Sequence, residues 1–424
     1  MTRSRIALLV VLFLLCGAAS AQSRYAIQNA RIVTVSGNPI ERGTVLIEDG
    51  LVSAVGARVS IPRGTEVIDG RNLSVYPGLF NSNTTIGLTE IGSVAVTSDN
   101  QEMGEFMPHL LAFSAFHIES EHIPVARVDG ITHILSRPSG GILPGQGALM
   151  HMDGWSHEEL EINRRGALIM SLPVLLGGGG RRGRRGGGGS YTQAKQRFDE
   201  KIVEIKELFE RARYYGRSRQ DGLTTKMDRQ LEALEPALNG EQVVLLEANS
   251  HVDIQEAVKF AQSEKLNYVI LGGRDAWKIP DFLRENNVRL ILGPTQNLPS
   301  SEDDHVSQVY RAPGALHAAG IRFAFATGGN SNARTLPFEV GNAVAHGLPY
   351  DVALRSITLT PAEFFGVGDK LGSIETGKIA NLVVTDGDIL EYQTKIHHIF
   401  IKGKPISLDS KHTLLYEKYR ARPN

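Results

Sequence analysis

Apolar and polar residues alternate in short runs over residues 25–75, and turn-forming residues separate the runs. The run over residues 43–48 is followed by Asp49-Gly50 and then by a second apolar run over residues 51–56. Alternation with a period of two predicts half-buried strands, and Asp-Gly tolerates the positive backbone dihedrals of a hairpin turn. This segment therefore predicts a small antiparallel β unit.

The middle of the chain changes to short apolar runs that alternate with amphipathic segments of helical period. Apolar runs over residues 242–246 and 268–271 precede helical patterns over 254–265 and 276–285, and further apolar runs follow at 289–292 and 321–326. Alternating strands and helices predict an α/β fold with a parallel barrel. The span from residue 77 to residue 365 exceeds the roughly 250 residues of a typical barrel. It therefore leaves room for insertions.

One insertion is visible in the composition. Residues 177–190 read GGGGRRGRRGGGGS, a tract that cannot bury a core. Clustered arginines can hold phosphate or an anionic polymer. We expect a solvated loop instead, because glycine tracts are not preorganised for binding. The charged segment that follows, over residues 193–215, predicts a helix packed on the outside of the barrel through Phe198, Ile202, Ile205 and Leu208.

The first residues have the three-part layout of a secretory signal peptide. Arg3 and Arg5 precede an apolar run over residues 6–15, and Ala19-Ser20-Ala21 follows it. The run is too short to span a bilayer comfortably, so we expect cleavage after Ala21. Cys16, the one cysteine, is then removed, and the mature chain has neither a disulfide nor a thiolate metal ligand. The expectation is a periplasmic or secreted protein with no membrane span after cleavage.

Charge gives no argument for a polyanionic partner, because 45 basic residues balance 46 acidic ones. No excess of positive charge favours nucleic acid or an anionic membrane surface. We therefore expect a small-molecule ligand or a protein partner, and no nucleic acid.

Two segments resemble signatures of the amidohydrolase superfamily. Residues 77–85, Pro-Gly-Leu-Phe-Asn-Ser-Asn-Thr-Thr, resemble its first barrel strand, which reads Pro-Gly-apolar-apolar-Asp-x-His-x-His. Residues 372–383 resemble its Gly-Ser-Ile-Glu-x-Gly-Lys-x-Ala-Asp-Leu-Val segment, with Asn381 in place of the aspartate. The chain is similar to imidazolonepropionase-like, metal-dependent hydrolases of this superfamily. The resemblance implies a (β/α)8 TIM-like barrel with a flanking β-sandwich that the N- and C-terminal segments form together.

The resemblance also suggests how the chain is divided. We expect a signal peptide over residues 1–21, the N-terminal part of the β-sandwich over 22–76, and the barrel over 77–365 with the Gly/Arg-rich insertion at 177–190. Residues 366–424 would complete the β-sandwich and form a tail.

The family's metal ligands have counterparts here that bind metal poorly. In the family, two histidines come from strand one, a lysine or glutamate from strand four, histidines from strands five and six, and an aspartate from strand eight. The strand-four position has no assignment in this sequence. The other positions hold an amide, a hydroxyl, one carboxylate and two glycines: Asn83, Thr85, Glu247, Gly272 and Gly328. We expect these five residues to line a barrel-mouth pocket with no metal or other cofactor, although the family norm is zinc or another divalent ion.

The resemblance implies a hydrolase of non-peptide or cyclic-amide carbon–nitrogen bonds. In that chemistry the metal lowers the pKa of a bound water and an aspartate moves its proton. Because both parts are replaced here, the residues favour a pseudoenzyme that binds a small ligand or a protein partner, such as an active relative. Whether the chain is an enzyme stays open. The alternative is an active hydrolase whose metal site is rebuilt from other residues: His117, His122, His151, Asp153 and His157.

Two further segments have a structural and a functional interpretation. Residues 138–147 are rich in glycine and could bind an anion through backbone amides, but they lack the lysine of a phosphate loop. We expect a loop at the mouth of the barrel. His251 follows the fifth predicted strand and either faces the barrel mouth or begins the next helix.

Overall fold

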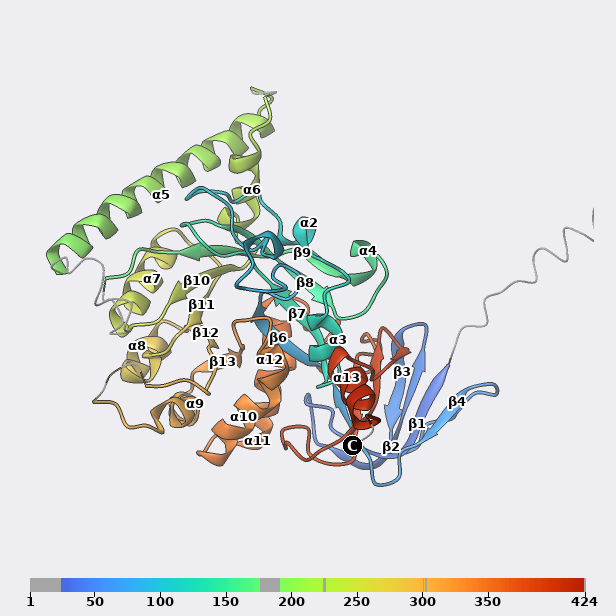
Figure 1. Cartoon of the computed structure of the whole chain (residues 1–424). Coiled ribbons are helices and arrows are strands. Elements are labelled where there is room, and N and C mark those ends of the chain that lie inside the picture. The colour runs from blue at the N-terminus through green and yellow to red at the C-terminus, as the bar shows by residue number, and fades with distance from the viewer. Residues whose placement is uncertain (1–23, 176–190, 224–225, 300, 302, 423–424) are drawn as a thin grey trace, which may run out of the picture.

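Two sheets organise the computed structural model of the chain (Figure 1). The structure describes residues 24–175, 191–223, 226–299, 301 and 303–422. The predicted signal peptide and the Gly/Arg-rich tract lie outside the described residues.

The first sheet joins the two ends of the chain, as the resemblance predicted. Its order is β16-β15-β14-β5-β1-β2-β3, and β4 pairs with β1 in addition. Val383 of β14 lies opposite Tyr76 of β5, which connects the C-terminal segment to the N-terminal one. The turn between β2 and β3 is the predicted hairpin, with positive φ angles at Asp49 (56°) and Gly50 (80°). The strands are β1 (Tyr25–Ile32), β2 (Ile40–Glu48), β3 (Leu51–Gly56), β4 (Glu66–Asp69), β5 (Ser74–Pro77), β14 (Leu382–Thr385), β15 (Ile396–Ile401) and β16 (Lys404–Ile406).

The second sheet has eight strands and curves into the barrel, which confirms the predicted TIM-like fold class. Its order follows the chain from β6 to β13. The strands are β6 (Leu79–Thr84), β7 (Ile131–Ser136), β8 (Gly145–His151), β9 (Glu161–Ser171), β10 (Val244–Ala248), β11 (Tyr268–Gly272), β12 (Arg289–Leu292) and β13 (Arg322–Phe325).

The expectation that every barrel strand is parallel is wrong at β8. This strand pairs antiparallel with both β7 and β9, whereas the other pairs in the sheet are parallel. Only residues 137–144 connect β7 to β8, and a crossover between parallel strands needs a dozen or more residues. The chain must therefore turn back at this point. The glycine-rich segment 138–147, expected to be a loop, accordingly contains the start of β8.

Helices cover the outer side of the barrel. In Figure 1, α7, α8 and α9 lie beside strands β10 to β13, and α5 runs along the edge of the molecule. Helix α5 extends the predicted 193–215 segment at both ends and buries Phe198, Ile205 and Leu208. The helices are α2 (Ala112–Ala115), α3 (His122–Arg127), α4 (His157–Leu160), α5 (Tyr191–Gln220), α6 (Arg229–Leu238), α7 (His251–Ser263), α8 (Pro280–Glu285), α9 (Gln308–Ala318), α10 (Leu336–Ala345), α11 (Tyr350–Ser356), α12 (Leu359–Phe364) and α13 (Lys411–Arg420), with short 3-10 turns η1 (Ala95–Thr97), η2 (Ala276–Lys278) and η3 (Ala333–Thr335).

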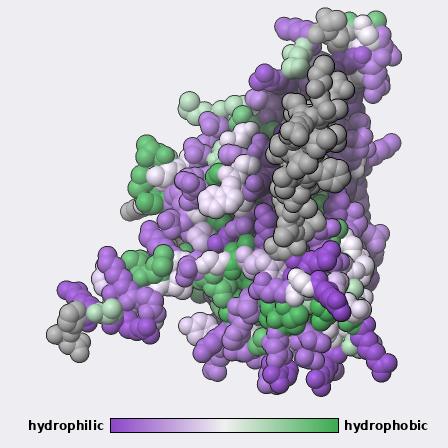
Figure 2. All heavy atoms as spheres, turned by 90° about the vertical axis from the view of Figure 1, so that its right-hand side faces the viewer, coloured by the Kyte–Doolittle hydropathy of each residue, from purple (hydrophilic) through white to green (hydrophobic). Residues whose placement is uncertain are grey.

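Figure 2 shows a mainly hydrophilic face that separate apolar patches interrupt. Within the described ranges, no helix combines the length and the apolar character that a membrane span requires.

Successive side chains along each barrel strand point to opposite faces of the sheet, so the core has two layers, one inside the barrel and one between the strands and the helices. Phe80, Leu245, Ile291 and Ala324 share one buried cluster with Phe365, which follows α12. Their strand neighbours, such as Leu246 and Leu290, belong to the cluster that contains the helices. Burial of each large aliphatic side chain contributes about 1.5–3 kcal/mol. The inner layer fills the inside of the barrel.

A side-chain pair joins the first strand of the barrel to the segment that follows the last one. The fully buried Asn81 donates through Nδ2 to Thr327 Oγ1 at 2.8 Å and accepts from the Thr327 N–H at 3.3 Å. The Gly328 N–H donates to the Asn83 carbonyl at 3.0 Å. These contacts hold β6 beside the chain that follows β13.

We expect Asn81→Ala to lower the free energy of unfolding by about 2 kcal/mol, because the buried Thr327 groups lose their partner. Urea denaturation measures this change. The exposed Asn239, which ends α6, is a control: Asn239→Ala should change stability by no more than about 0.5 kcal/mol. Equal effects of both substitutions would contradict the inference that Asn81 holds β6 beside the chain that follows β13.

Candidate functional site

Four polar side chains meet at the C-terminal end of the barrel strands. Because side chains alternate along a strand, residues two positions after an inward apolar residue also face inward. Arg137 follows Leu135 in this way, Ser171 follows Ile169, and Glu247 follows Leu245. Asn83 near the end of β6 is the fourth residue.

These side chains form one hydrogen-bonded network with Arg137 at its centre. Arg137 Nε donates to Asn83 Oδ1 at 2.6 Å, and Nη2 donates to Glu247 Oε1 at 3.3 Å. Arg137 Nη1 donates to the Pro138 carbonyl at 3.2 Å. The other carboxylate oxygen of Glu247 accepts from Ser171 Oγ at 2.7 Å. The Arg137 side chain is only 11% exposed, whereas that of Glu247 is 38% exposed and so reaches the solvent.

The residues at the family's ligand positions do not fit a divalent metal. Of Asn83, Thr85, Glu247, Gly272 and Gly328, only Glu247 supplies a strong ligand group. Its carboxylate already faces the guanidinium of Arg137, and a second cation there would be repelled. Across the part of the chain that the structure describes, no three His, Cys, Asp or Glu side chains are arranged to hold a metal ion.

The alternative metal ligands do not come together either. His122 Nε2 lies 2.9 Å from the Glu90 carbonyl, and His157 Nε2 lies 2.8 Å from the Phe116 carbonyl. Asp153 forms an ion pair with Arg127, and His151 is buried on β8 beside Asn381. His117 follows α2 in a loop, where its backbone N–H donates to the Gly87 carbonyl. The side chains of His122, His151, Asp153 and His157 therefore have local structural partners.

Glycines leave space on the other side of the barrel mouth. A Cβ atom added to Gly293 or Gly329 would meet no atom within 4 Å, and one at Gly328 would meet only Asn83 Nδ2, at 3.9 Å. A Cβ atom at Gly272 would approach Asn249 Oδ1 to 2.5 Å, so that glycine permits close packing instead. Thr85 is half-buried in the turn that follows β6. His251 is the first residue of α7.

A cavity of about 410 Å³ opens beside the network. Ser171, Glu247, Asn249 and Arg274 contribute polar groups to its lining, and Leu172 contributes an apolar wall. The carboxylate of Glu247 and the hydroxyl of Ser171 can therefore hydrogen-bond a ligand while Arg137 holds them in place.

Sequence reasoning missed Arg137 and Ser171. Each carries a weak signal, since each is a polar residue directly after an apolar strand pattern, where barrel proteins place their site residues. Ser171 ends β9, the fourth strand of the sheet, and so supplies the strand-four position that had no assignment. The pairing of Arg137 with Glu247 spans 110 residues and depends on the curvature of the sheet, which brings the ends of β7 and β10 together.

Comparison with known proteins gives a partial sequence match. The amidohydrolase family model matches residues 222–406. The amidohydrolase tasK of Hapsidospora irregularis is 35% identical over 86 residues, which are 19% of this chain and 9% of that protein. The match thus spans less than a tenth of the length of that relative.

Solved structures match over most of the chain. An amidohydrolase from Thermotoga maritima MSB8 superposes with a TM-score of 0.78 at 22% identity, over 90% of this chain and 99% of that one. A prolidase complexed with N-methylphosphonate-L-proline gives a TM-score of 0.55 at 17% identity, over 91% and 99% of the two chains. Molinate hydrolase gives 0.56 at 16% identity, over 95% and 98%. The predicted resemblance to the amidohydrolase superfamily is thereby confirmed, in sequence over residues 222–406 and in fold over nine-tenths of the chain.

Proposed function

We propose that this protein is a degenerate amidohydrolase, which binds a small ligand at the barrel mouth without the family's metal ion. The position of the Arg137 guanidinium, between Asn83 and Glu247, carries the proposal. A permanent side-chain cation lies between the positions on strands one and five that hold the metal in the family. It neutralises Glu247 and occupies the lone pairs that a metal ion would need.

The hydrolytic mechanism of the family has no counterpart among these side chains. Gly328 stands where the family has the aspartate that transfers the proton, and glycine has no acid or base group. Glu247 could accept a proton, but it already accepts hydrogen bonds from Arg137 and Ser171. The site is therefore better suited to hydrogen-bonding a polar ligand than to activating water.

We also propose that the protein is exported and acts in the periplasm or outside the cell. The signal-like pattern of residues 1–21 supports this address. A protein partner, such as an active relative, is compatible with the same loss of catalysis.

The metal content of the mature protein tests the proposal most directly. The protein is purified without chelator from the export compartment and analysed by mass spectrometry for zinc, iron and manganese. We expect substoichiometric metal and no chelator-sensitive hydrolysis of dipeptides or cyclic amides. One equivalent of metal per chain, together with hydrolysis that a chelator abolishes, would overturn the proposal.

Glu247→Ala is expected to weaken ligand binding at the 410 Å³ cavity about tenfold, because one charged hydrogen-bonding group contributes about 1.4 kcal/mol. The fold should persist, because Arg137 keeps its contacts with Asn83 and Pro138. Calorimetric titration with N-acetyl amino acids and hydantoins measures the affinity. The exposed Glu285→Ala is the matched control. Unchanged affinity in Glu247→Ala would contradict the assignment of this pocket.

A further inference from the structure

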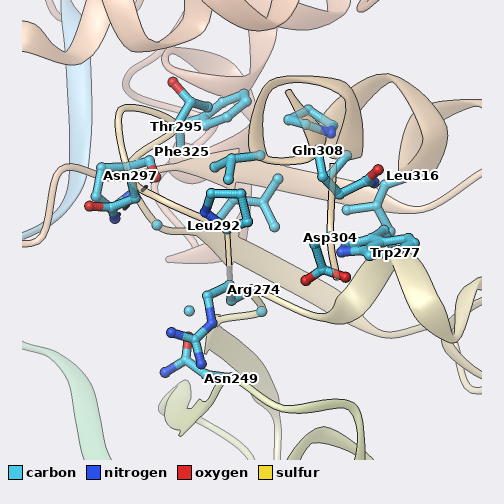
Figure 3. A pocket seen from close by; sticks show the side chains of 18 of the residues that line it. Asn249, Arg274, Trp277, Leu292, Thr295, Asn297, Asp304, Gln308, Leu316 and Phe325 are labelled. Carbon is cyan, nitrogen blue, oxygen red and sulfur yellow. Dashed lines mark hydrogen bonds between the residues drawn. The ribbon is translucent and has the colours of Figure 1, made fainter. Parts of the chain in front are cut away.

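A second cavity of about 200 Å³ lies between the barrel wall and helix α9 (Figure 3). Leu292 and Phe325 line it from β12 and β13, and Leu316 lines it from α9. These three residues belong to the outer core layer, whereas Ile291 and Ala324 point into the barrel. The cavity therefore lies outside the barrel, and the Arg137 network contributes no side chain to its lining.

The walls of this cavity are mainly apolar. Val309, Ala312 and Pro313 of α9 complete the side opposite the strands. At about 30 Å³ per water molecule, 200 Å³ has room for about seven waters or for one phenyl or branched alkyl group. The interior therefore suits the apolar body of a small organic molecule.

Arg274 and Asn249 form a polar opening at one end of the cavity. Figure 3 shows the two side chains next to each other, and both also border the 410 Å³ cavity beside Glu247. Their backbones are fixed, because the Gly273 N–H donates to the Ala248 carbonyl at 2.8 Å and the Asp275 N–H donates to the Asn249 carbonyl at 2.9 Å. These hydrogen bonds hold the backbone on both sides of Arg274 in place at the opening.

Arg274 is exposed and has no hydrogen bond or ion pair with any other described residue. The carboxylates near it do have a cation: Lys278 Nζ lies 3.5 Å from Asp275 and 3.6 Å from Asp304. An arginine guanidinium presents a planar fork of N–H donors that matches a carboxylate in two parallel hydrogen bonds. Arg274 therefore offers an anion-binding group at the mouth of an apolar cavity.

We propose that this cavity binds a small organic carboxylate, with its aromatic or branched apolar body between β12, β13 and α9 and its carboxylate on Arg274. The inference rests on the proposed ligand-binding role and assigns the chemical class of a ligand. Asn249 adds an amide beside the carboxylate.

Calorimetric titration of the full-length protein with hydrocinnamate and with the neutral hydrocinnamamide tests the proposal. The two probes have the same apolar body and differ in charge. We expect the amide to bind at least tenfold more weakly than the acid. Arg274→Ala should weaken acid binding at least tenfold and make the two probes equal, and Arg274→Lys should give an intermediate affinity. The exposed Arg63→Ala is the matched control and should have no effect.

Gly293→Val tests the cavity without changing any charge. Gly293 lines the cavity, its φ is not in the left-handed region, and an added Cβ would meet no atom within 4 Å. The valine should therefore fold normally and abolish hydrocinnamate binding by filling the space. Equal affinity for acid and amide in the wild type, no binding of either, or unchanged affinity in Gly293→Val would each overturn this inference. None of those outcomes changes the metal content of the protein, so this inference can be overturned while the proposed metal-free function stands, and the reverse.

Discussion

Replacement of Arg137 by alanine is expected to lower the free energy of unfolding by about 3 kcal/mol. Arg137 is almost fully buried directly after β7, and its hydrogen bonds to Asn83 and Glu247 connect it to β6 and β10, while a third reaches the Pro138 carbonyl. Hydrogen bonds to a charged group contribute about 1.5–3 kcal/mol, and the aliphatic stem of arginine adds packing. The ion pair with Glu247 alone contributes less, because the carboxylate is 38% exposed and solvent screens it.

A double-mutant cycle in urea distinguishes a coupled network from separate contacts. Arg137→Ala combined with Glu247→Gln should cost about 1 kcal/mol less than the sum of the single substitutions, since both remove the same interaction. Arg137→Lys should recover only part of the stability, because an ammonium group lacks the fork that reaches Asn83 and Glu247 together. Costs that add within about 0.3 kcal/mol would show that Arg137 and Glu247 act independently.

The elements that could be predicted from the sequence are those whose own residues determine their conformation. Asp49-Gly50 sets a hairpin by its own backbone preferences, and the apolar runs of β10 and β11 read as strands without knowledge of their neighbours. The antiparallel β8 was not predicted. Its sequence, Gly145–His151, gives no direction, and only the short connection from β7 fixes it.

The site was predictable only at the positions that a family pattern marks. Asn83 and Glu247 were found because they occupy places where the pattern has ligands. Arg137 was not, because the family pattern assigns it no role and its partners are distant in sequence. A search for metal ligands does not consider arginine, so it passes over Arg137. Three-dimensional proximity was needed to show it.

A buried pair of histidines lies on the neighbouring antiparallel strands β7 and β8. His133 of β7 is directly opposite His151 of β8, and both are buried. His133 Nδ1 lies 2.7 Å from Thr132 Oγ1, its ring packs on Phe80, and its Nε2 has no hydrogen-bond partner among the described residues. Burial lowers the pKa of His133 to about 3. Burial also lowers the pKa of His151, with smaller contributions from His133 and Lys402.

These pKa shifts predict a loss of stability in mild acid. The unfolded chain binds a proton at each histidine below a pKa of about 6.5, whereas the folded chain keeps His133 neutral down to about pH 3. Stability is therefore complete above about pH 6.5 and falls as the pH decreases from there. By linkage, His133 alone should cost about 2 kcal/mol at pH 5 relative to pH 7.

Asp129 acts in the opposite direction, because burial raises its pKa to about 6, and the folded chain therefore gains stability from its protonation as the pH falls. Comparison of wild type with His133→Gln cancels this contribution. The variant replaces the titrating ring by a neutral amide, so its urea midpoint should depend less on pH between 7 and 5, by an amount that corresponds to about 2 kcal/mol. The exposed His412→Gln should keep the wild-type pH dependence. If His133→Gln loses as much stability in acid as the wild type, the buried histidine is not the group that the acid protonates.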